Sequence, residues 1–341
     1  MRVVESKAWA KINLAFDVVG LRPDGYHDIE TVMHRVELAD EIRVERLEAG
    51  AVSEYEIRVD VFPQVAPAGT ENIAYRAAMA FFEAAGERGV VSIGIGKKIP
   101  VAAGLGGGSA DAAAVLASMN RLWDVPLAED ELYHLARSVG ADVPFCLMCH
   151  GDPPQAWAAM ACGIGDDLTP LPPLPGVAVV LAKPSVSLLA GEMYGMWDAR
   201  RARAMGGRGN ARARALANWM RSQGGSALKG DAVSGSPVAQ VVHLIGNELE
   251  PVAAERCPEV LEVKAALLEL GAMAAVMSGS GPTVFGLFES DDSAHSAARS
   301  LRKRAFSLSG RGPLDVIVTH AGPRIPPSIS KDLRGTQFNP K

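Results

Sequence analysis

Residues 98–114 read KIPVAAGLGGGSADAAA, a loop of small residues that runs directly into a helical pattern. The glycines within Gly104–Gly108 leave the loop with little side-chain bulk, so backbone N–H groups can close around an anion. The following helix would add the positive end of its dipole, with Ser109 as N-cap and Asp111 in its first turn. The block is not a Walker A loop, because no Gly-Lys-Ser/Thr ends it, and a dinucleotide-binding fingerprint would need a third glycine at Ser109. The pattern favours a phosphate-binding loop over a purely structural turn.

Strand and helix patterns lie on both sides of this loop. Alternating apolar residues predict a half-buried strand at Ile12–Phe16, and Arg22–Gly25 has the residues of a tight turn. The other predicted strands are 42–45, 55–61 and 91–95, and the predicted helices are 72–85, 129–139 and 259–270. The segment 274–288 reads as a strand, a glycine loop and a second strand. These patterns indicate an α+β fold.

The length of 341 residues predicts two domains, because a domain takes on the order of 150 residues. The proline-rich stretch at 171–176 is the clearest break, so we expect one domain over 1–171 and a second over 172–322. Residues 200–235 are rich in arginine, glycine and serine and show no apolar periodicity. We expect them to form a mobile insertion whose shortening leaves activity intact. Residues 323–341 are expected to form a frayed tail.

The net charge of −5 argues against general nucleic-acid binding. No apolar run reaches the ~18 residues of a membrane span, and charges at Glu5 and Lys7 argue against a signal peptide. Four cysteines without an export signal suggest free thiols in the cytoplasm. The string Cys146–His150, CLMCH, matches a haem-attachment motif, and with Cys162 it could supply zinc ligands; buried thiols are the favoured interpretation.

Two further blocks could carry chemistry. Asp142 lies in GADVPF between small and apolar neighbours, where a carboxylate could act as a general base or hold a metal, although it could equally cap a helix. The segment Met277–Thr283, MSGSGPT, is a second loop of small residues, able to approach a ligand closely or to serve only as a tight connection.

Together these blocks resemble the GHMP kinases, named for galactose, homoserine, mevalonate and phosphomevalonate kinases. AWAKINLAFDVVGLRPDGYHDIETV, PVAAGLGGGSADAAA and MSGSGPTVFGLF stand in the order and spacing of that family. The motifs AKINL, RPDGYHDIET, GADVPF, TENIAYRA (70–77) and NELEPV (247–252) are most similar to its branch that phosphorylates a cytidine-diphosphate-linked methylerythritol. The resemblance covers 8–145 and 247–288. It implies a two-domain α+β GHMP kinase fold with the active site in the interdomain cleft.

The resemblance also implies the reaction and its residues. ATP would phosphorylate the 2-hydroxyl of 4-diphosphocytidyl-2-C-methyl-D-erythritol, in the non-mevalonate route to isoprenoids. Lys11 and Asp142 match the catalytic pair, in which Asp142 takes the hydroxyl proton and the lysine keeps the Asp142 carboxylate ionised. Asn72 falls where the family approaches adenine. The ATP loop matches Pro100, Val101, Ala102, Ala103, Gly104, Leu105, Gly106, Gly107, Gly108, Ser109 and Ala110.

On the acceptor side, Tyr26 and His27 match the pair that recognises cytosine by stacking and hydrogen bonding, and Asn13 falls near the methylerythritol. Tyr194 corresponds to the aromatic residue that closes over the base. Mg²⁺ is expected with the ATP phosphates, through Ser109. The implied partners are the two small-molecule substrates, without nucleic acid or membrane, for a monomer or weak homodimer.

Two alternatives stay open at the level of sequence. One is another GHMP kinase acting on a small alcohol such as homoserine or mevalonate, which the Tyr26-His27 pair argues against because those substrates carry no base. The other is a non-catalytic nucleotide-binding relative, which the presence of both Lys11 and Asp142 argues against. A longer stretch than the family pattern, 146–165, separates GADVPF from the next glycine motif.

Overall fold

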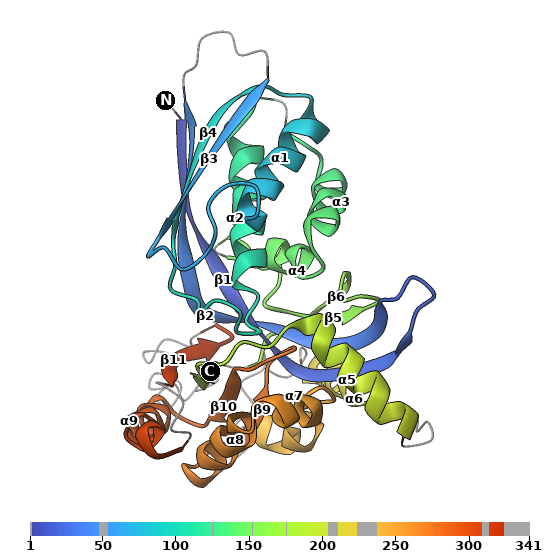
Figure 1. The fold of residues 1–341 in the computed structure, drawn as a ribbon, viewed down its shortest axis with the longest axis vertical. Coiled ribbons are helices and arrows are strands. Elements are labelled where there is room, and N and C mark those ends of the chain that lie inside the picture. The colour runs from blue at the N-terminus through green and yellow to red at the C-terminus, as the bar shows by residue number, and fades with distance from the viewer. Residues whose placement is uncertain are drawn as a thin grey trace, which may run out of the picture.

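The computed structural model describes residues 2–47, 54–124, 126–151, 153–174, 176–203, 211–223, 237–308 and 314–323. It has two stacked halves, each a sheet with helices on one face, and long strands pass from one half into the other (Figure 1). Across these residues, no helix combines the length and apolarity that a membrane span requires.

Two long antiparallel strands, β1 (Arg2–Leu21) and β2 (His27–Leu47), form the spine. A turn connects them, in which the N–H of Gly25 donates to the carbonyl of Arg22 at 3.1 Å, as its residue types predict. On the other side of β2 lie further strands of the first half. They are β4 (Gly89–Gly96), β3 (Tyr55–Phe62), which runs parallel to β4, and the hairpin of β5 (Ala158–Cys162) and β6 (Asp167–Leu171).

Four helices cover one face of this sheet (Figure 1). They are α1 (Ile73–Ala85), α2 (Gly107–Leu122), α3 (Glu129–Val139) and α4 (Val143–Met148). Phe81, Phe82 and Trp123 pack edge to face in the core beneath them, so the sheet and the helices share one apolar interior.

The second half is an antiparallel sheet in the order β11-β7-β10-β9, covered by helices. It joins the first half through one β11–β2 pair, Ala321 opposite Val36, and through β8 (Gly246–Asn247), which runs parallel to β1. Its other elements are β7 (Val177–Lys183), α7 (Glu250–Arg256), α8 (Glu259–Glu269), β9 (Ala274–Met277), β10 (Val284–Phe288), α9 (Asp291–Leu308) and β11 (Asp315–Ala321).

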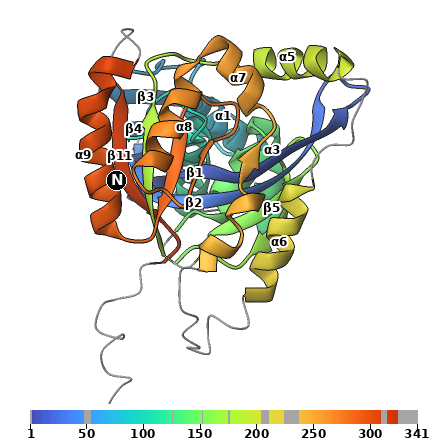
Figure 2. The same ribbon diagram turned by 90° about the horizontal axis from the view of Figure 1, so that it is seen from below.

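The expectation of a mobile insertion at 200–235 is wrong for its described central part. Residues Arg212–Gln223 form α6, which lies along β1, β2 and β5 (Figure 2), while α5 (Ala190–Arg203) ends inside the expected insertion. Two short 3₁₀ turns, Pro237–Gln240 and Val242–Leu244, follow. Residues 204–210, 224–236 and the expected tail at 324–341 lie outside the described residues.

Helix α6 is held by apolar burial and by its N-terminal cap. Ala213, Leu216, Ala217 and Met220 are buried, at spacings of three and four residues. The Oδ2 of Asp17 on β1 accepts a hydrogen bond from the N–H of Ala213 at 2.8 Å, and burial raises the pKa of Asp17 to about 6. The periodicity is hard to see in the sequence because arginines and other polar residues stand between these apolar positions.

Three local predictions also need correction. Helix α2 begins at Gly107 with Gly106 as its N-cap, so Ser109 lies in the first turn and is not the cap. Asp111 lies beyond that first turn and is buried. The strand at Ile12–Phe16 is buried on both faces, because helices pack against it. The domain division after residue 171, between β6 and β7, stays a proposal.

Candidate active site

A cavity of about 660 Å³ lies where the two halves meet. It is bordered by β1, β2, the turn between them, the loop before α2, the start of α4, helix α5 and the β9–β10 loop. Lys11, Asn13, Tyr26, His27, Gly104, Gly106, Ser109, Asp142, Tyr194, Asp198, Gly279 and Ser280 are among its lining residues. The structure therefore brings nine of the eighteen sequence-predicted site residues to one cavity.

Lys11 and Asp142 face each other in this cavity, with 3.4 Å between Nζ and Oδ2. The lysine side chain is only 6% exposed and the aspartate 33%, so the carboxylate remains open to a ligand while the ammonium is enclosed. A β-bulge between Trp9 and Lys11 shifts the register of β1 just before the lysine. Asp142 lies immediately before α4, where Pro144 is at the start of the helix.

A chain of hydrogen bonds fixes the lysine. Its Nζ donates to Oδ1 of Asn13 at 2.7 Å, and Nδ2 of Asn13 donates to the Thr31 hydroxyl at 2.9 Å. That hydroxyl donates in turn to the carbonyl of Ala15 at 2.7 Å. Each partner has a defined donor or acceptor role, so the ammonium is held beside Asp142 with little freedom.

The glycine loop lies against Lys11 and the β9–β10 loop. A Cβ at Gly106 would stand 2.9 Å from Cγ of Lys11, and one at Gly104 would stand 2.3 Å from the Ser278 carbonyl oxygen. The Ser278 hydroxyl donates to the Gly104 carbonyl at 3.0 Å, which joins the two small-residue loops. Both glycines also have positive φ, so their lack of a side chain has a clear structural reason.

Three positions of the predicted ATP loop, Gly104, Gly106 and Ser109, border the cavity. The first turn of α2 begins there, and the N–H groups of a first turn have no partner within their own helix. The side chains of Ala103, Leu105 and Ala110 are instead buried in the core. Those three residues can serve a nucleotide only through their backbone.

Replacing Gly104 with alanine is expected to raise the KM for ATP by tenfold or more, since about 1.4 kcal/mol of lost binding energy corresponds to a factor of ten. The added Cβ would collide with backbone, which cannot rotate away, and φ of +74° disfavours any side chain. ATP titration of initial rates measures the effect. Gly20→Ala is the matched control, because its Cβ would meet nothing within 4 Å. An unchanged KM for ATP in folded Gly104→Ala would contradict this role of the loop.

The acceptor side of the cavity holds an aromatic cluster. The His27 ring stacks on Tyr194 of α5 with 4.7 Å between centroids and 15° between planes, and it meets Trp197 edge-on at 6.0 Å. Tyr26 also borders the cavity and is 63% exposed. Burial and the nearby charge of Asp142 hold the pKa of Tyr194 above its usual range, so its phenol stays neutral. Tyr194, expected from the sequence to close over the base, thus borders the same cavity as Tyr26 and His27.

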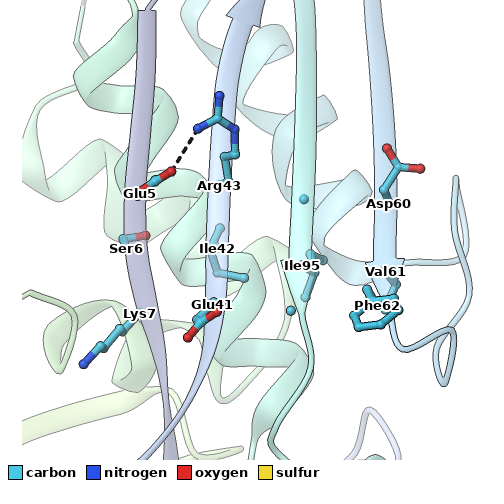
Figure 3. Close-up of a pocket in the computed structure, with 12 residues that line it drawn as sticks. Glu5, Ser6, Lys7, Glu41, Ile42, Arg43, Asp60, Val61, Phe62 and Ile95 are labelled. Carbon is cyan, nitrogen blue, oxygen red and sulfur yellow. Dashed lines mark hydrogen bonds and ion pairs between the residues drawn. The ribbon is translucent and has the colours of Figure 1, made fainter.

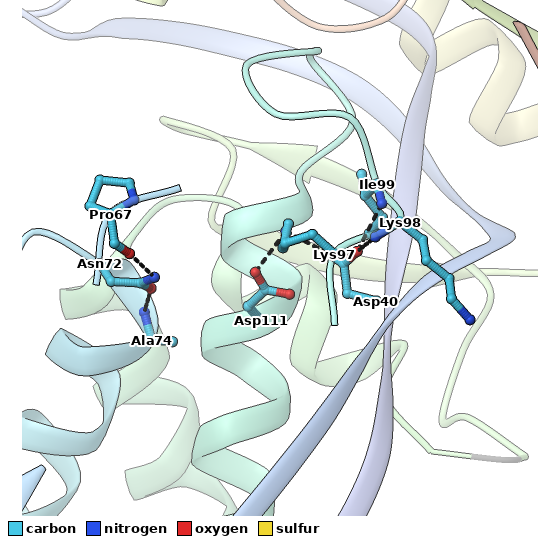
Figure 4. Close-up of polar contacts among 8 residues, drawn as sticks. All are labelled: Asp40, Pro67, Asn72, Ala74, Lys97, Lys98, Ile99 and Asp111. Atoms are coloured by element: carbon cyan, nitrogen blue, oxygen red, sulfur yellow. Dashed lines mark hydrogen bonds and ion pairs between the residues drawn. The ribbon is translucent and has the colours of Figure 1, made fainter. Parts of the chain in front are cut away.

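Asn72, expected near adenine, is not among the residues lining this cavity. Its Oδ1 accepts from the N–H of Ala74 at 2.9 Å and its Nδ2 donates to the Pro67 carbonyl at 2.7 Å (Figure 4). The side chain thus caps α1 and anchors the preceding loop. A role of Asn72 at adenine stays a proposal.

A buried ionic cluster lies beneath the glycine loop (Figure 4). Nζ of Lys97 lies 2.5 Å from Asp40 and 2.8 Å from Asp111. Asp40 also accepts the N–H groups of Lys98 and Ile99, so the cluster ties the start of the loop to the helix after it. Burial and the second carboxylate, Asp40, raise the pKa of Asp111, because two carboxylates share one ammonium.

This raised pKa predicts a pH-dependent stability. A carboxyl group whose pKa is higher in the folded state stabilises the fold below its unfolded pKa, near 3.8, and that contribution is lost as the pH rises through the folded pKa. We therefore expect the melting temperature of Asp111→Asn to fall less than that of the wild type between pH 5 and pH 8. Thermal scans at both pH values measure it. An equal change in melting temperature between the two pH values for both proteins would show that Asp111 is already ionised at pH 5.

The CLMCH string holds buried thiols, as predicted. Cys146 and Cys149 are free and buried, and burial raises the pKa of both thiols. Arg35 lies between the rings of Trp9 and Trp157, at 3.9 and 4.4 Å, and donates to the carbonyls of Cys149 and Gly151. The string is thus the end of α4 and a connection fixed by a buried arginine.

A second hollow, of about 780 Å³, lies over β1, β2, β4 and β3, on the face of the first-half sheet that is turned away from its helices (Figure 3). Charged side chains such as Glu5, Lys7, Arg43 and Asp60 border it, and Glu5 pairs with Arg43 at 2.9 Å. None of the sequence-predicted site residues lines it. The smaller cavity between the halves is therefore the candidate active site.

Three residues in or beside the site are not singled out from the sequence. Thr31 completes the chain from Lys11, and Asn247 donates from Nδ2 to the carbonyls of Met277 and Gly279; they lie in the motifs RPDGYHDIET and NELEPV. Asp198, which accepts a hydrogen bond from His27, lies in no motif. Asp198 stands one helical turn after Tyr194, and this spacing is the one signal that could have drawn attention to it.

Comparisons with known proteins show the family of the chain. Residues 72–150 match the family model "GHMP kinases N terminal domain" and residues 226–307 match "GHMP kinases C terminal". A relative from Pelotomaculum thermopropionicum, named 4-diphosphocytidyl-2-C-methyl-D-erythritol kinase, is 41% identical over 88% of this chain and 94% of its own length. A relative of the same name from Alkaliphilus metalliredigens is 39% identical over 88% and 93%.

Solved structures are also similar to this chain. A crystal structure titled 4-(cytidine 5'-diphospho)-2C-methyl-D-erythritol kinase superposes with a TM-score of 0.69 and 33% identity, over 94% of this chain and all of that one. Mevalonate kinase from L. major, with a TM-score of 0.65 and 13% identity over 94% and 96% of the two chains, shares the fold alone. The predicted α+β GHMP kinase fold is confirmed, and the chain belongs to the 4-diphosphocytidyl-2-C-methyl-D-erythritol kinase family within the GHMP kinases.

Proposed function

We propose that this protein transfers the γ-phosphoryl group of ATP to the 2-hydroxyl of 4-diphosphocytidyl-2-C-methyl-D-erythritol. The observation that carries the proposal is the Lys11–Asp142 pair, 3.4 Å apart, in a cavity whose other walls are the glycine loop and the aromatic cluster. One side of the cavity suits a polyphosphate and the other a base, so the pair lies between the two expected substrates. Relatives of this name at about 40% identity support the same reaction.

In this mechanism Asp142 accepts the proton of the acceptor hydroxyl as the hydroxyl oxygen attacks the γ-phosphorus of ATP. The bond from the γ-phosphorus to the β,γ-bridging oxygen breaks, and ADP leaves. Lys11 stabilises the negative charge that develops on the attacking hydroxyl oxygen. Phosphoryl transfer depends on in-line positioning and charge stabilisation more than on covalent help. The Asn13–Thr31 chain supplies the positioning of the lysine, and the N-terminus of α2 supplies N–H groups for the phosphates.

Mg²⁺ fits the oxygen donors of this cavity. The Ser109 hydroxyl in the first turn of α2 and the partly exposed Asp142 carboxylate both border it. Mg²⁺ commonly uses one or two protein oxygens together with substrate phosphates and waters, so no larger protein cage is needed. When bound, the ion would neutralise phosphate charge, and Ser109 is the residue proposed to hold it.

Homoserine and mevalonate kinases share the fold, so the acceptor must be decided by the aromatic cluster. Tyr26, His27 and Tyr194 offer ring faces and a ring nitrogen to a base, which neither small alcohol carries. This cluster favours the cytidine-bearing acceptor. We propose a monomer or weak homodimer as the active form.

Measuring ATP consumption with 4-diphosphocytidyl-2-C-methyl-D-erythritol, homoserine and mevalonate tests the proposal. We expect turnover with the cytidine substrate and rates at least about a hundredfold lower with the two small alcohols, because those leave the base site empty. Turnover of homoserine or mevalonate at comparable kcat/KM would overturn it.

A further inference from the structure

The two ring nitrogens of His27 have different surroundings. Nε2 lies 2.9 Å from Oδ1 of Asp198. Nδ1 has no hydrogen-bond partner among the described residues, and it is not one of their fully buried unpaired atoms. The ring borders the cavity, so Nδ1 is the nitrogen left for a ligand.

Asp198 determines whether Nδ1 of His27 donates or accepts a hydrogen bond. A carboxylate only accepts hydrogen bonds, so Nε2 must carry its proton to bond with it. In the neutral imidazole the other nitrogen then holds a lone pair and acts as an acceptor. Stacking on Tyr194 and the edge contact with Trp197 keep the ring from turning, which fixes this arrangement.

An acceptor at Nδ1 distinguishes the two common pyrimidines. Cytosine carries a 4-amino group, which donates, whereas uracil carries a carbonyl oxygen at the same place, which accepts. A base bonded in the plane of the His27 ring would also lie nearly parallel to Tyr194, whose plane differs by 15°. The same ring arrangement thus allows stacking and reading of the base edge.

We propose that Asp198 is a specificity-determining positioning residue: by accepting the Nε2–H of His27, it presents Nδ1 as an acceptor to the 4-amino group of cytosine. This inference rests on the proposed function and adds the reason for choosing cytidine over uridine. Asp198 acts through His27 and has no contact with the transferred phosphoryl group in this account.

The test compares cytidine- and uridine-diphosphate-linked methylerythritol as acceptors for the wild type, Asp198→Ala and Asp198→Asn. The ratio of kcat/KM for cytidine over uridine is expected to fall by about tenfold in Asp198→Ala, the scale of one lost base-edge hydrogen bond, with the KM for ATP unchanged. Asp198→Asn can still accept from Nε2–H through its amide oxygen, so it should restore most of the ratio. Arg200→Ala is the matched control on the same helix, because Arg200 is exposed and pairs with Glu255 rather than His27, and it should leave the ratio unchanged.

A ¹⁵N NMR spectrum of His27 supplies a readout that a merely structural role would not move. We expect a protonated Nε2 and an unprotonated Nδ1 in the wild type, with the two forms mixed in Asp198→Ala. A proton on Nδ1 in the wild type, or an unchanged ratio in folded Asp198→Ala, would overturn the inference while leaving the proposed function intact. A wild type that turns over neither acceptor would overturn both.

Discussion

Asp142→Asn is expected to lower kcat by about 10²–10⁴-fold, because a positioned base that accepts the hydroxyl proton contributes that much. An asparagine amide has nearly the same shape, so it can occupy the place 3.4 Å from Lys11 but cannot take the proton. The KM for ATP should change little, since the glycine loop and the start of α2 are untouched. Steady-state rates at saturating ATP and acceptor measure the effect.

Asp60→Asn is the matched control for this change. Asp60 is exposed on β3, far in sequence from the site, and its replacement also removes one negative charge. Equal losses in the two variants would point to net charge as the cause. A kcat within about threefold of wild type in Asp142→Asn would remove this aspartate from the chemistry.

Leu216→Ala is expected to destabilise the fold by about 2–5 kcal/mol, the usual cost of emptying a buried leucine site. Leu216 is 1% exposed and lies in α6, in the core shared by β1 and the second-half strands.

Deleting 205–234 would remove α6 altogether, so we expect that variant to lose folding and activity. This reverses the expectation drawn from the sequence, in which the segment is a dispensable insertion.

Chemical denaturation with fluorescence or circular dichroism measures the change in unfolding free energy. Asn218→Ala, an exposed position on the same helix, is the control and should fall within about 0.5 kcal/mol of the wild type. If Leu216→Ala matched that control, α6 would not be packed in solution as it is here. A soluble, active deletion variant would lead to the same conclusion.

Several elements are predictable because their causes are local. The pattern at 72–85 predicts a helix that starts at Asn72, and Asn72 caps α1 (Ile73–Ala85). The helix at 129–139 has the predicted bounds, and the turn at Arg22–Gly25 forms as its residue types require. Helix caps and turns depend on the backbone needs of four or five consecutive residues, which one stretch of sequence contains.

Other elements depend on what packs against them. The alternation at Ile12–Phe16 predicts one solvated face, but β1 is buried on both faces there. Asn13 is buried beside Lys11 and Thr31, and Asp17 is buried against the start of α6. The short strand predicted at 42–45 is the end of β2, a 21-residue strand. The earlier part of β2, with Thr31 and Arg35, is not predicted because buried polar residues break the apolar pattern there.

The sequence alone identified the family resemblance, the glycine loop and the residues Lys11, Asp142, Tyr26, His27 and Tyr194. It could do so because motifs contain residues whose side-chain chemistry or backbone freedom is required at a fixed position in the chain. The tertiary structure decided their partners. His27 meets Asp198 across 171 residues, and Lys97 meets Asp40 across 57. It also placed α6 in the core and aligned the Nε2–H of His27 with a carboxylate. Such pairings depend on the folded path of the chain, because one side chain's hydrogen-bond role and burial are set by neighbours far away in sequence.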